Sequence, residues 1–447
     1  MSRVARAVRR RLAAGGAVRR AGDLVAVGSA AAVGVLLGAV AMAGVQDARS
    51  GPDGPAPDPD QAVARGSFAA SPAPAPASAE AADRWGGHRG HDEPPLPAAP
   101  AVLLAWTPGG LDQGLAAAAT ADPAVGATSV VRGGVVDLVA SRDPTGGAVD
   151  DPAPGWAIPL DAVAVDPAAH AGFVSVADRA TVAALRDGQA LLGATSAELR
   201  RLGPGSVVDL AGGASVTVAG VVSDAAIGGA EMAVDRPTGE RLGLGVDRYV
   251  LAAYGGERAP LEGRLRSSLP AGAAVRFRGP GETPFLRNGD AVLPQVLIKQ
   301  RFGEFAYRPG AGDGFDQDPA WQDRTLVTVD LPIIGQARCH RGVADALAGA
   351  LGEVASANLA SLIDRDGFAG CWNARTTRAG TSVSRHAWGV AVDLNFGANP
   401  TGLASVQDPR LVAIFRRWGF TDGSGWLVPD AGHFEYVSPP GRDAGRQ

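Results

Sequence analysis

Two short segments near the C-terminus combine residue types that could bind a metal ion. The first, SRHAWGVAVD, ends at Asp393, and the second, GHFEYV, begins at Gly432. Apolar side chains alternate with small or polar ones at the end of the first segment and along the second, which predicts a β-strand in each. Pairing of these strands would bring His386, Asp393 and His433 together. Two imidazoles and a carboxylate suit Zn2+, and three protein ligands leave its fourth position for water.

Hydrolysis at such a centre also needs a group that takes a proton from the water. Bound Zn2+ can lower the pKa of water to about 7, so a neighbouring carboxylate can accept the proton. Asp430 lies three residues before His433, and Glu435 lies two residues after it. Both are candidates for this general base.

The spacing of these residues follows a known pattern. Ser-x-His-x-x-Gly-x-Ala-x-Asp is filled by Ser384, His386, Gly389, Ala391 and Asp393. A carboxylate-x-x-His-Phe-Glu segment follows at 430–435. Together the two segments resemble the zinc D-Ala-D-Ala carboxypeptidases and L-Ala-D-Glu endopeptidases of peptidoglycan, which include the VanY-type enzymes and many phage endolysins. The resemblance extends over about residues 296–440.

The resemblance implies a zinc-dependent peptidase that acts on the stem peptides of peptidoglycan. It implies that His386, Asp393 and His433 bind Zn2+ and that Asp430 is the general base. Carboxypeptidase members usually have glutamate there, whereas aspartate is similar to the endopeptidase branch, so Glu435 stays as the second candidate. The motifs do not separate carboxypeptidase from endopeptidase. The alternative function is a non-catalytic cell-wall binding module that keeps the peptidase fold.

The resemblance also implies two residues that contact the substrate. Arg375 lies where the family has an arginine that stabilises the oxyanion or holds a substrate carboxylate, and a guanidinium fork suits both roles. Arg378 is a nearby alternative. Ser384 is expected to orient the substrate or a ligand, or else to cap the strand. Arg385 is expected to be solvated.

Two amphipathic helices are expected beside these strands. Apolar residues recur at helical spacing from Val343 to Val354, in a helix expected to end near Gly367. Asp408 and Pro409 predict the start of a second helix, which Gly419 closes. Helices followed by a short antiparallel sheet indicate an α+β fold for this domain.

The N-terminus carries a signal for membrane insertion or export. Seven arginines precede the first acidic residue, Asp23, and an uncharged run of 22 residues follows from Leu24 to Val45. As a helix this run would be about 33 Å long, enough to cross a bilayer. We therefore expect a single-pass protein of the cell membrane with residues 1–23 in the cytoplasm and the remaining domains outside. The alternatives are a cleaved signal peptide, which would make the protein secreted, and a buried core helix.

Cys339 and Cys371 are the two cysteines of the chain. Outside the cytoplasm they are expected to form a disulfide that brackets the first helix. A metal pair is the alternative, but two thiolates would be surplus beside a complete His/Asp/His set.

The middle of the chain lacks a catalytic pattern. Residues 46–100 are rich in proline and alanine and predict a disordered linker. Residues 101–295 predict a mixed, mainly-β domain with helical character over 174–202 and a hairpin over 207–222. The stretch 202–224 resembles the extracellular core domain of ABC-exporter-type permeases. We interpret this domain as a spacer or a binding module, with protein partners unknown.

The composition and net charge exclude some classes of protein and partner. The chain has 62 glycines and 33 prolines among 447 residues, which excludes a helical bundle, and its net charge of −5 argues against nucleic acid as a partner. The expected architecture is therefore α+β. A transmembrane helix, a linker and a mainly-β domain would precede a peptidase domain over 296–441, which has a small antiparallel sheet and flanking helices.

Overall fold

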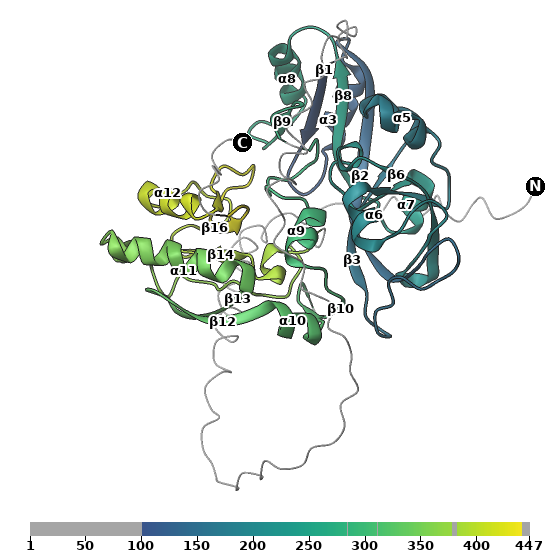
Figure 1. The fold of residues 1–447 in the computed structure, drawn as a ribbon. Coiled ribbons are helices and arrows are strands. Elements are labelled where there is room, and N and C mark those ends of the chain that lie inside the picture. Colours follow the sequence, from purple (N-terminus) through teal and green to yellow (C-terminus); the bar gives the residue numbers. More distant parts are fainter. Residues whose placement is uncertain (1–100, 284, 311, 378–381, 440–447) are drawn as a thin grey trace, which may run out of the picture. The chain divides into compact units, whose positions relative to one another are not determined.

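The structure is a computed structural model that describes residues 101–439 except 284, 311 and 378–381 (Figure 1). The predicted tail 1–23, transmembrane helix 24–45 and linker 46–100 lie outside the described residues. Within the described part, no helix is both long enough and apolar enough to cross a membrane.

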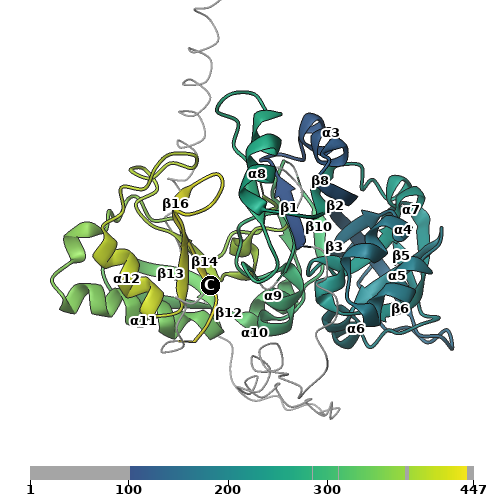
Figure 2. The ribbon, with the colours of Figure 1, turned by 90° about the horizontal axis from the view of Figure 1, so that it is seen from above.

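A nine-stranded sheet dominates the first half of the described chain. Its strands, in spatial order, are β3 (Ile158–Val165), β7 (Met232–Asp235), β4 (Gln189–Gly193), β6 (Ala214–Val222), β5 (Val207–Leu210), β2 (Val125–Arg142), β8 (Asp247–Tyr254), β1 (Ala101–Trp106) and β9 (Arg276–Arg278). The long strand β2 also pairs with β3, so the six strands from β3 to β2 close into a ring. Figure 2 shows β1, β8 and β2 side by side.

This sheet overturns the α+β assignment. It mixes parallel pairs, β3 with β7 and β4 with β6, with antiparallel ones, so the described chain has a mixed α/β architecture. The helix expected over 174–202 is interrupted by β4, whose Leu191 and Leu192 are buried. A short apolar run fits a buried strand and a buried helix equally well, which explains the error.

The hairpin predicted over 207–222 is confirmed. Strands β5 and β6 pair antiparallel, with Val208 opposite Val216. Between them Gly212 and Gly213 both have positive φ, at 81° and 82°, which favours glycine at the turn.

Six α-helices accompany this sheet in the described residues before 284, and none exceeds ten residues. They are α3 (Gln113–Ala121), α4 (Pro167–His170), α5 (Val176–Ala183), α6 (Ala194–Arg200), α7 (Arg236–Arg241) and α8 (Arg258–Ser267).

The C-terminal part has its own core and small antiparallel sheets. Its helices are α9 (Gln295–Phe302), α10 (Pro319–Thr325), α11 (Arg341–Ser356) and α12 (Pro409–Arg417). Its strands are β10 (Tyr307–Pro309), β11 (Phe315–Gln317), β12 (Leu326–Leu331), β13 (Gly335–His340), β14 (Ala391–Asp393), β15 (Phe420–Gly423) and β16 (Asp430–Tyr436). Strand β16 lies between β14 and β15 in a three-stranded sheet, and α11 and α12 pack together beside it (Figure 1).

The two predicted helices of this part are present. Helix α12 begins as expected, because the Asp408 carboxylate accepts a hydrogen bond from the backbone N–H of Arg410. Helix α11 buries its predicted apolar face but ends at Ser356 instead of near Gly367, and Asn358 follows with a φ of 57°. Left-handed backbone at this position ends the helix.

A disulfide and a buried ionic cluster hold the C-terminal part in place. Cys339 of β13 and Cys371 are joined by a disulfide and fully buried. The Lys299 ammonium of α9 lies 2.9 Å from carboxylate oxygens of both Glu231 and Glu304. Arg200 of α6 pairs with the same two carboxylates. These four charged groups connect α9 with the nine-stranded region.

Candidate metal centre

The pairing of β14 with β16 positions three groups that could bind a metal ion. Asp393 lies directly opposite His433 in this antiparallel pair. His386 lies in the 3-10 helix η5 (Arg385–Trp388), just before β14. One ligand atom from each of the three residues can be chosen so that all lie within 4.8 Å of one another. Local sequence thus places two ligands by strand register and the third by a turn.

The distances within the cluster are short. Nδ1 of His433 lies 2.9 Å from Oδ1 of Asp393, and Nε2 of His386 lies 3.3 Å from the same oxygen. The two ring nitrogens are 3.3 Å apart. Both imidazoles are buried. The three atoms therefore converge on one point.

The outer sides of both rings also have partners. Nδ1 of His386 lies 3.2 Å from the carbonyl oxygen of Gly370, which can only accept a hydrogen bond. Nε2 of His433 lies 3.4 Å from Oε1 of Glu435. In the neutral form of each ring, these partners favour the tautomer whose N–H points outward, which turns a lone pair toward Asp393. Two lone pairs and a carboxylate oxygen at one point call for a positive charge between them.

The pKa values of the cluster also indicate that a positive charge is favourable there. Burial disfavours the charged form of His433, but the carboxylates of Asp393 and Glu435 outweigh it and raise the pKa of His433 to about 10. Burial acts against ionisation of Asp393 as well, yet the two imidazoles lower its pKa well below the usual range. The site therefore holds an ionised carboxylate and attracts a cation or a proton.

Gly389 shapes the backbone that leads from η5 into β14. Its φ of 69° ends η5, and an added Cβ would lie 2.8 Å from the backbone nitrogen of His340. Its carbonyl accepts a hydrogen bond from that same nitrogen. Glycine is needed here so that the chain can turn closely past β13 into β14.

A cavity of about 610 Å³, which we call the metal-site cavity, opens onto the cluster. Asp430 and Glu435 both line it. Asp430 accepts a hydrogen bond of 3.1 Å from the Thr401 hydroxyl. Glu435 is buried against His433, and although burial opposes ionisation, His433 and the guanidinium groups of Arg385 and Arg287 lower its pKa.

The predicted substrate-contacting residues also line the metal-site cavity. Arg375 and Ser384 are both among its lining residues, and the backbone N–H of Ser384 donates to the carbonyl of Arg375. Ser384 precedes η5, and its side chain makes no capping hydrogen bond there. Arg385, expected to be solvated, is half-buried and donates to the carbonyl of Leu293 at 2.6 Å. Arg378 lies outside the described residues.

Sequence reasoning missed several contacts of this site. The Gly370 carbonyl that orients His386 carries no side-chain signal. Trp426 packs against His433 with ring centroids 5.4 Å apart, and Thr401 holds Asp430. A threonine in the loop after β14 and a tryptophan in the loop before β16 were the available signals, but their contacts depend on how these loops fold back.

Comparison with known proteins shows which family this segment is similar to. Residues 377–436 match a family model described as D-alanyl-D-alanine carboxypeptidase, and they include all three members of the cluster. This match supports a peptidase domain related to peptidoglycan. No curated protein matches the chain.

Six solved chains match part of this chain. One of them is the extracellular domain of the noncanonic ABC-type transporter YknZ from Gram-positive bacteria. The similarity covers 38% of this chain and 88% of that chain, with 13% identity and a TM-score of 0.24.

Proposed function

We propose that the C-terminal domain is a zinc-dependent peptidase that hydrolyses peptide bonds in the stem peptides of peptidoglycan. The observation that carries the proposal is the convergence of His386, Asp393 and His433 at a cavity inside the segment that matches the carboxypeptidase family. Two outward-donating imidazoles and one carboxylate are a donor set that fits Zn2+. When bound, zinc would supply a Lewis acid and an acidic water.

The other residues of the site have different roles in the proposed hydrolysis. Asp430 faces the metal-site cavity with one hydrogen bond from Thr401, so its carboxylate is the group we assign as general base. Glu435 faces the outer nitrogen of His433 and therefore positions that ligand. Arg375 would hold the oxyanion or a substrate carboxylate through its guanidinium group. Ser384 would orient the substrate at the entrance of η5.

The compartment that fits this function is outside the cytoplasm. The disulfide between Cys339 and Cys371 supports this assignment, because disulfides persist in oxidising compartments. Peptidoglycan stem peptides are found there as well.

The test is hydrolysis by the full chain. Purified protein with Zn2+ is incubated with muropeptides, and the products are identified by mass spectrometry, which also tells which bond is cut. We expect His386→Ala to abolish cleavage. If wild type and His386→Ala both leave the muropeptides intact but bind them equally, the domain is a cell-wall binding module instead.

A further inference from the structure

A second cavity, of about 370 Å³, adjoins the metal-site cavity. Ala291, Ser382, Arg385 and Trp426 line both, so the two cavities meet along a common wall. We call the second one the arginine pocket, because three arginines line it: Arg248, Arg287 and Arg385.

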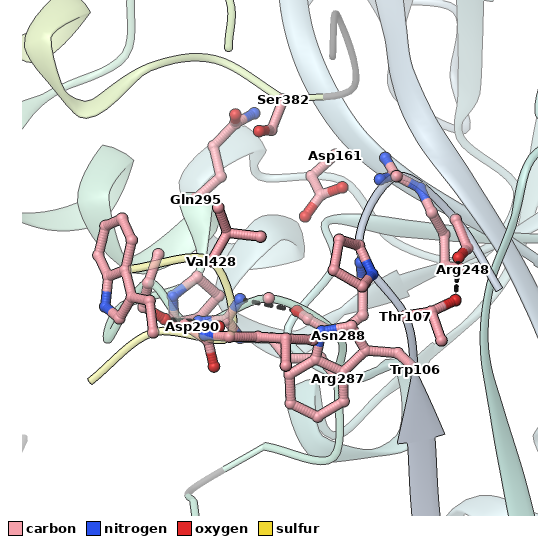
Figure 3. Close-up of a pocket in the computed structure, with 18 of the residues that line it drawn as sticks. Trp106, Thr107, Asp161, Arg248, Arg287, Asn288, Asp290, Gln295, Ser382 and Val428 are labelled. Atoms are coloured by element: carbon pink, nitrogen blue, oxygen red, sulfur yellow. Dashed lines mark hydrogen bonds between the residues drawn. The ribbon is translucent and has the colours of Figure 1, made fainter. Parts of the chain in front are cut away.

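The arginine pocket is built from both halves of the described chain (Figure 3). Trp106 of β1, Asp161 of β3 and Arg248 of β8 come from the nine-stranded sheet. Ser382 comes from the segment before β14, and Val428 comes from the segment just before β16. The domain of the nine-stranded sheet thus contributes side chains directly beside the metal-site cavity.

Two of the three arginines have no carboxylate partner. Arg287 donates to the backbone carbonyls of Asn288 and Ala291, and Arg385 donates to those of Val383 and Leu293. Among the described residues, neither guanidinium forms an ion pair. Nε of Arg385 is buried and has no hydrogen-bond partner within the same described part. Backbone carbonyls orient these two cations without neutralising their charge.

The acidic residues of the pocket do not restore the balance. Asp290 is already paired with Arg276 and Arg278, each at 3.0 Å. Asp161 lines the pocket, and the charges of Arg287 and Arg385 also lower the pKa of Glu435 in the adjoining cavity despite its burial, so the three guanidinium groups outnumber these two carboxylates. The pocket therefore carries a positive charge in a chain whose net charge is −5. A partly buried site with surplus guanidinium groups favours a carboxylate ligand, which an arginine can bind in bidentate geometry.

We propose that the arginine pocket is a substrate subsite that binds a second carboxylate of the peptide whose scissile bond lies at the His386/Asp393/His433 cluster. This inference rests on the proposed function for the class of substrate. The nine-stranded domain then has a role in selecting acidic stem peptides through Arg248, together with Arg287 from the following segment. Trp426 and Arg385, which line both cavities, mark the path between the scissile bond and the carboxylate.

The experiment compares two peptides that differ in one charge. One is a stem peptide with a free side-chain carboxylate, and the other is its analogue with a carboxamide. Binding is measured by calorimetry to the full-length His386→Ala protein, so that no cleavage disturbs it. We expect the acidic peptide to bind about tenfold more tightly. Arg287→Gln should reduce that preference to less than about threefold.

Two further variants keep the result interpretable. Arg248→Gln serves in place of Arg287→Gln if the latter unfolds, and it should reduce the preference in the same direction. Arg308→Gln removes an exposed arginine that pairs with Asp316 outside both cavities, and it should keep the full preference. Equal binding of both peptides, or an unchanged preference in the Arg287 and Arg248 variants, would overturn the proposal.

Cleavage by the wild-type protein separates the two proposals. If neither peptide is cleaved but the preference depends on Arg287, the peptidase assignment fails and the subsite stands. If both are cleaved and no preference exists, the subsite fails and the peptidase stands.

Discussion

His386 Nε2 and His433 Nδ1 lie 3.3 Å apart, and both lie within hydrogen-bonding distance of the same oxygen of Asp393. The other nitrogen of each ring also has a partner. Nδ1 of His386 lies beside the carbonyl of Gly370, and Nε2 of His433 lies beside the carboxylate of Glu435. The two inner nitrogens therefore cannot satisfy each other as neutral groups. A metal cation between them would resolve this conflict, as would a proton on His433, whose pKa Asp393 and Glu435 raise to about 10 despite its burial. The surrounding groups assign different roles to Asp430 and Glu435.

The two candidate bases can be separated by where each mutation acts. Asp430→Asn should keep Zn2+ bound but lower kcat by about 10²–10⁴, since a missing general base affects the chemical step. Glu435→Gln should instead weaken zinc affinity by about 10–100-fold, because it changes the outer partner of His433. Zinc titration and steady-state kinetics on both variants measure the two effects. The reverse pattern would make Glu435 the base.

The disulfide should stabilise both the fold and the cluster. Cys371 follows Gly370, whose carbonyl orients His386, and the bridge spans 32 residues of sequence. Replacing both cysteines by serine should lower the free energy of unfolding by about 3–4 kcal/mol in the chain-entropy account and also weaken zinc binding. Urea unfolding and zinc titration check this. If the double variant binds zinc as the wild type does, Gly370 is held independently of the bridge.

His340 should make the protein less stable in mild acid. Its Nδ1 accepts from the Gly342 N–H and its Nε2 donates to the Phe302 carbonyl, so the neutral ring is required. Burial lowers the pKa of His340 to about 4, against about 6.5 in an unfolded chain. The contribution of the neutral ring to the free energy of unfolding is therefore complete above pH 6.5. It falls by about 3 kcal/mol as the pH is lowered toward 4.

The control for this pH dependence is His340→Gln. Glutamine can make both hydrogen bonds without titrating, so the loss of stability between pH 6.5 and 4 should shrink by that amount. Unfolding curves of the two proteins at several pH values measure the difference. Identical pH profiles would show that His340 does not titrate in this window.

The buried ionic cluster should be costly to break. Lys299→Met leaves Glu231 and Glu304 facing Arg200 alone, with one negative charge uncompensated. We expect about 3–5 kcal/mol of destabilisation, whereas Arg410→Met, at an exposed pair, should cost less than about 1 kcal/mol. Adding Glu304→Gln to Lys299→Met should recover part of the loss. Chemical denaturation of the three variants provides the comparison.

Sequence reasoning succeeded where the signal was local. The turn at Gly212 and Gly213 and the start of α12 at Asp408 are set by backbone conformation and capping, which neighbouring residues decide. The strand alternation around Asp393 and His433 likewise predicted a pairing that the structure contains. Such features can be predicted from the periodicity of apolar residues, the residues at turns and the residues that cap helices.

The errors concern features that depend on distant parts of the chain. Leu191 and Leu192 became part of a strand because β6 and β7, one on each side of β4, supply the hydrogen-bond partners of a central strand. Arg385 was expected to be solvated, but Leu293, 92 positions earlier, supplies the carbonyl that it binds. The arginine pocket likewise joins Arg248 to Ser382, and no local pattern connects them.

The most direct test of the central claim is the metal dependence of hydrolysis in matched carboxylate variants. The full-length protein is stripped of metal with a chelator, zinc is returned stepwise, and bound zinc and muropeptide cleavage are measured together. We predict that wild type and Asp316→Asn, whose carboxylate is exposed, bind one zinc and regain cleavage in proportion, while Asp393→Asn does neither. Cleavage at the wild-type rate by Asp393→Asn, or by protein free of metal, would contradict the account.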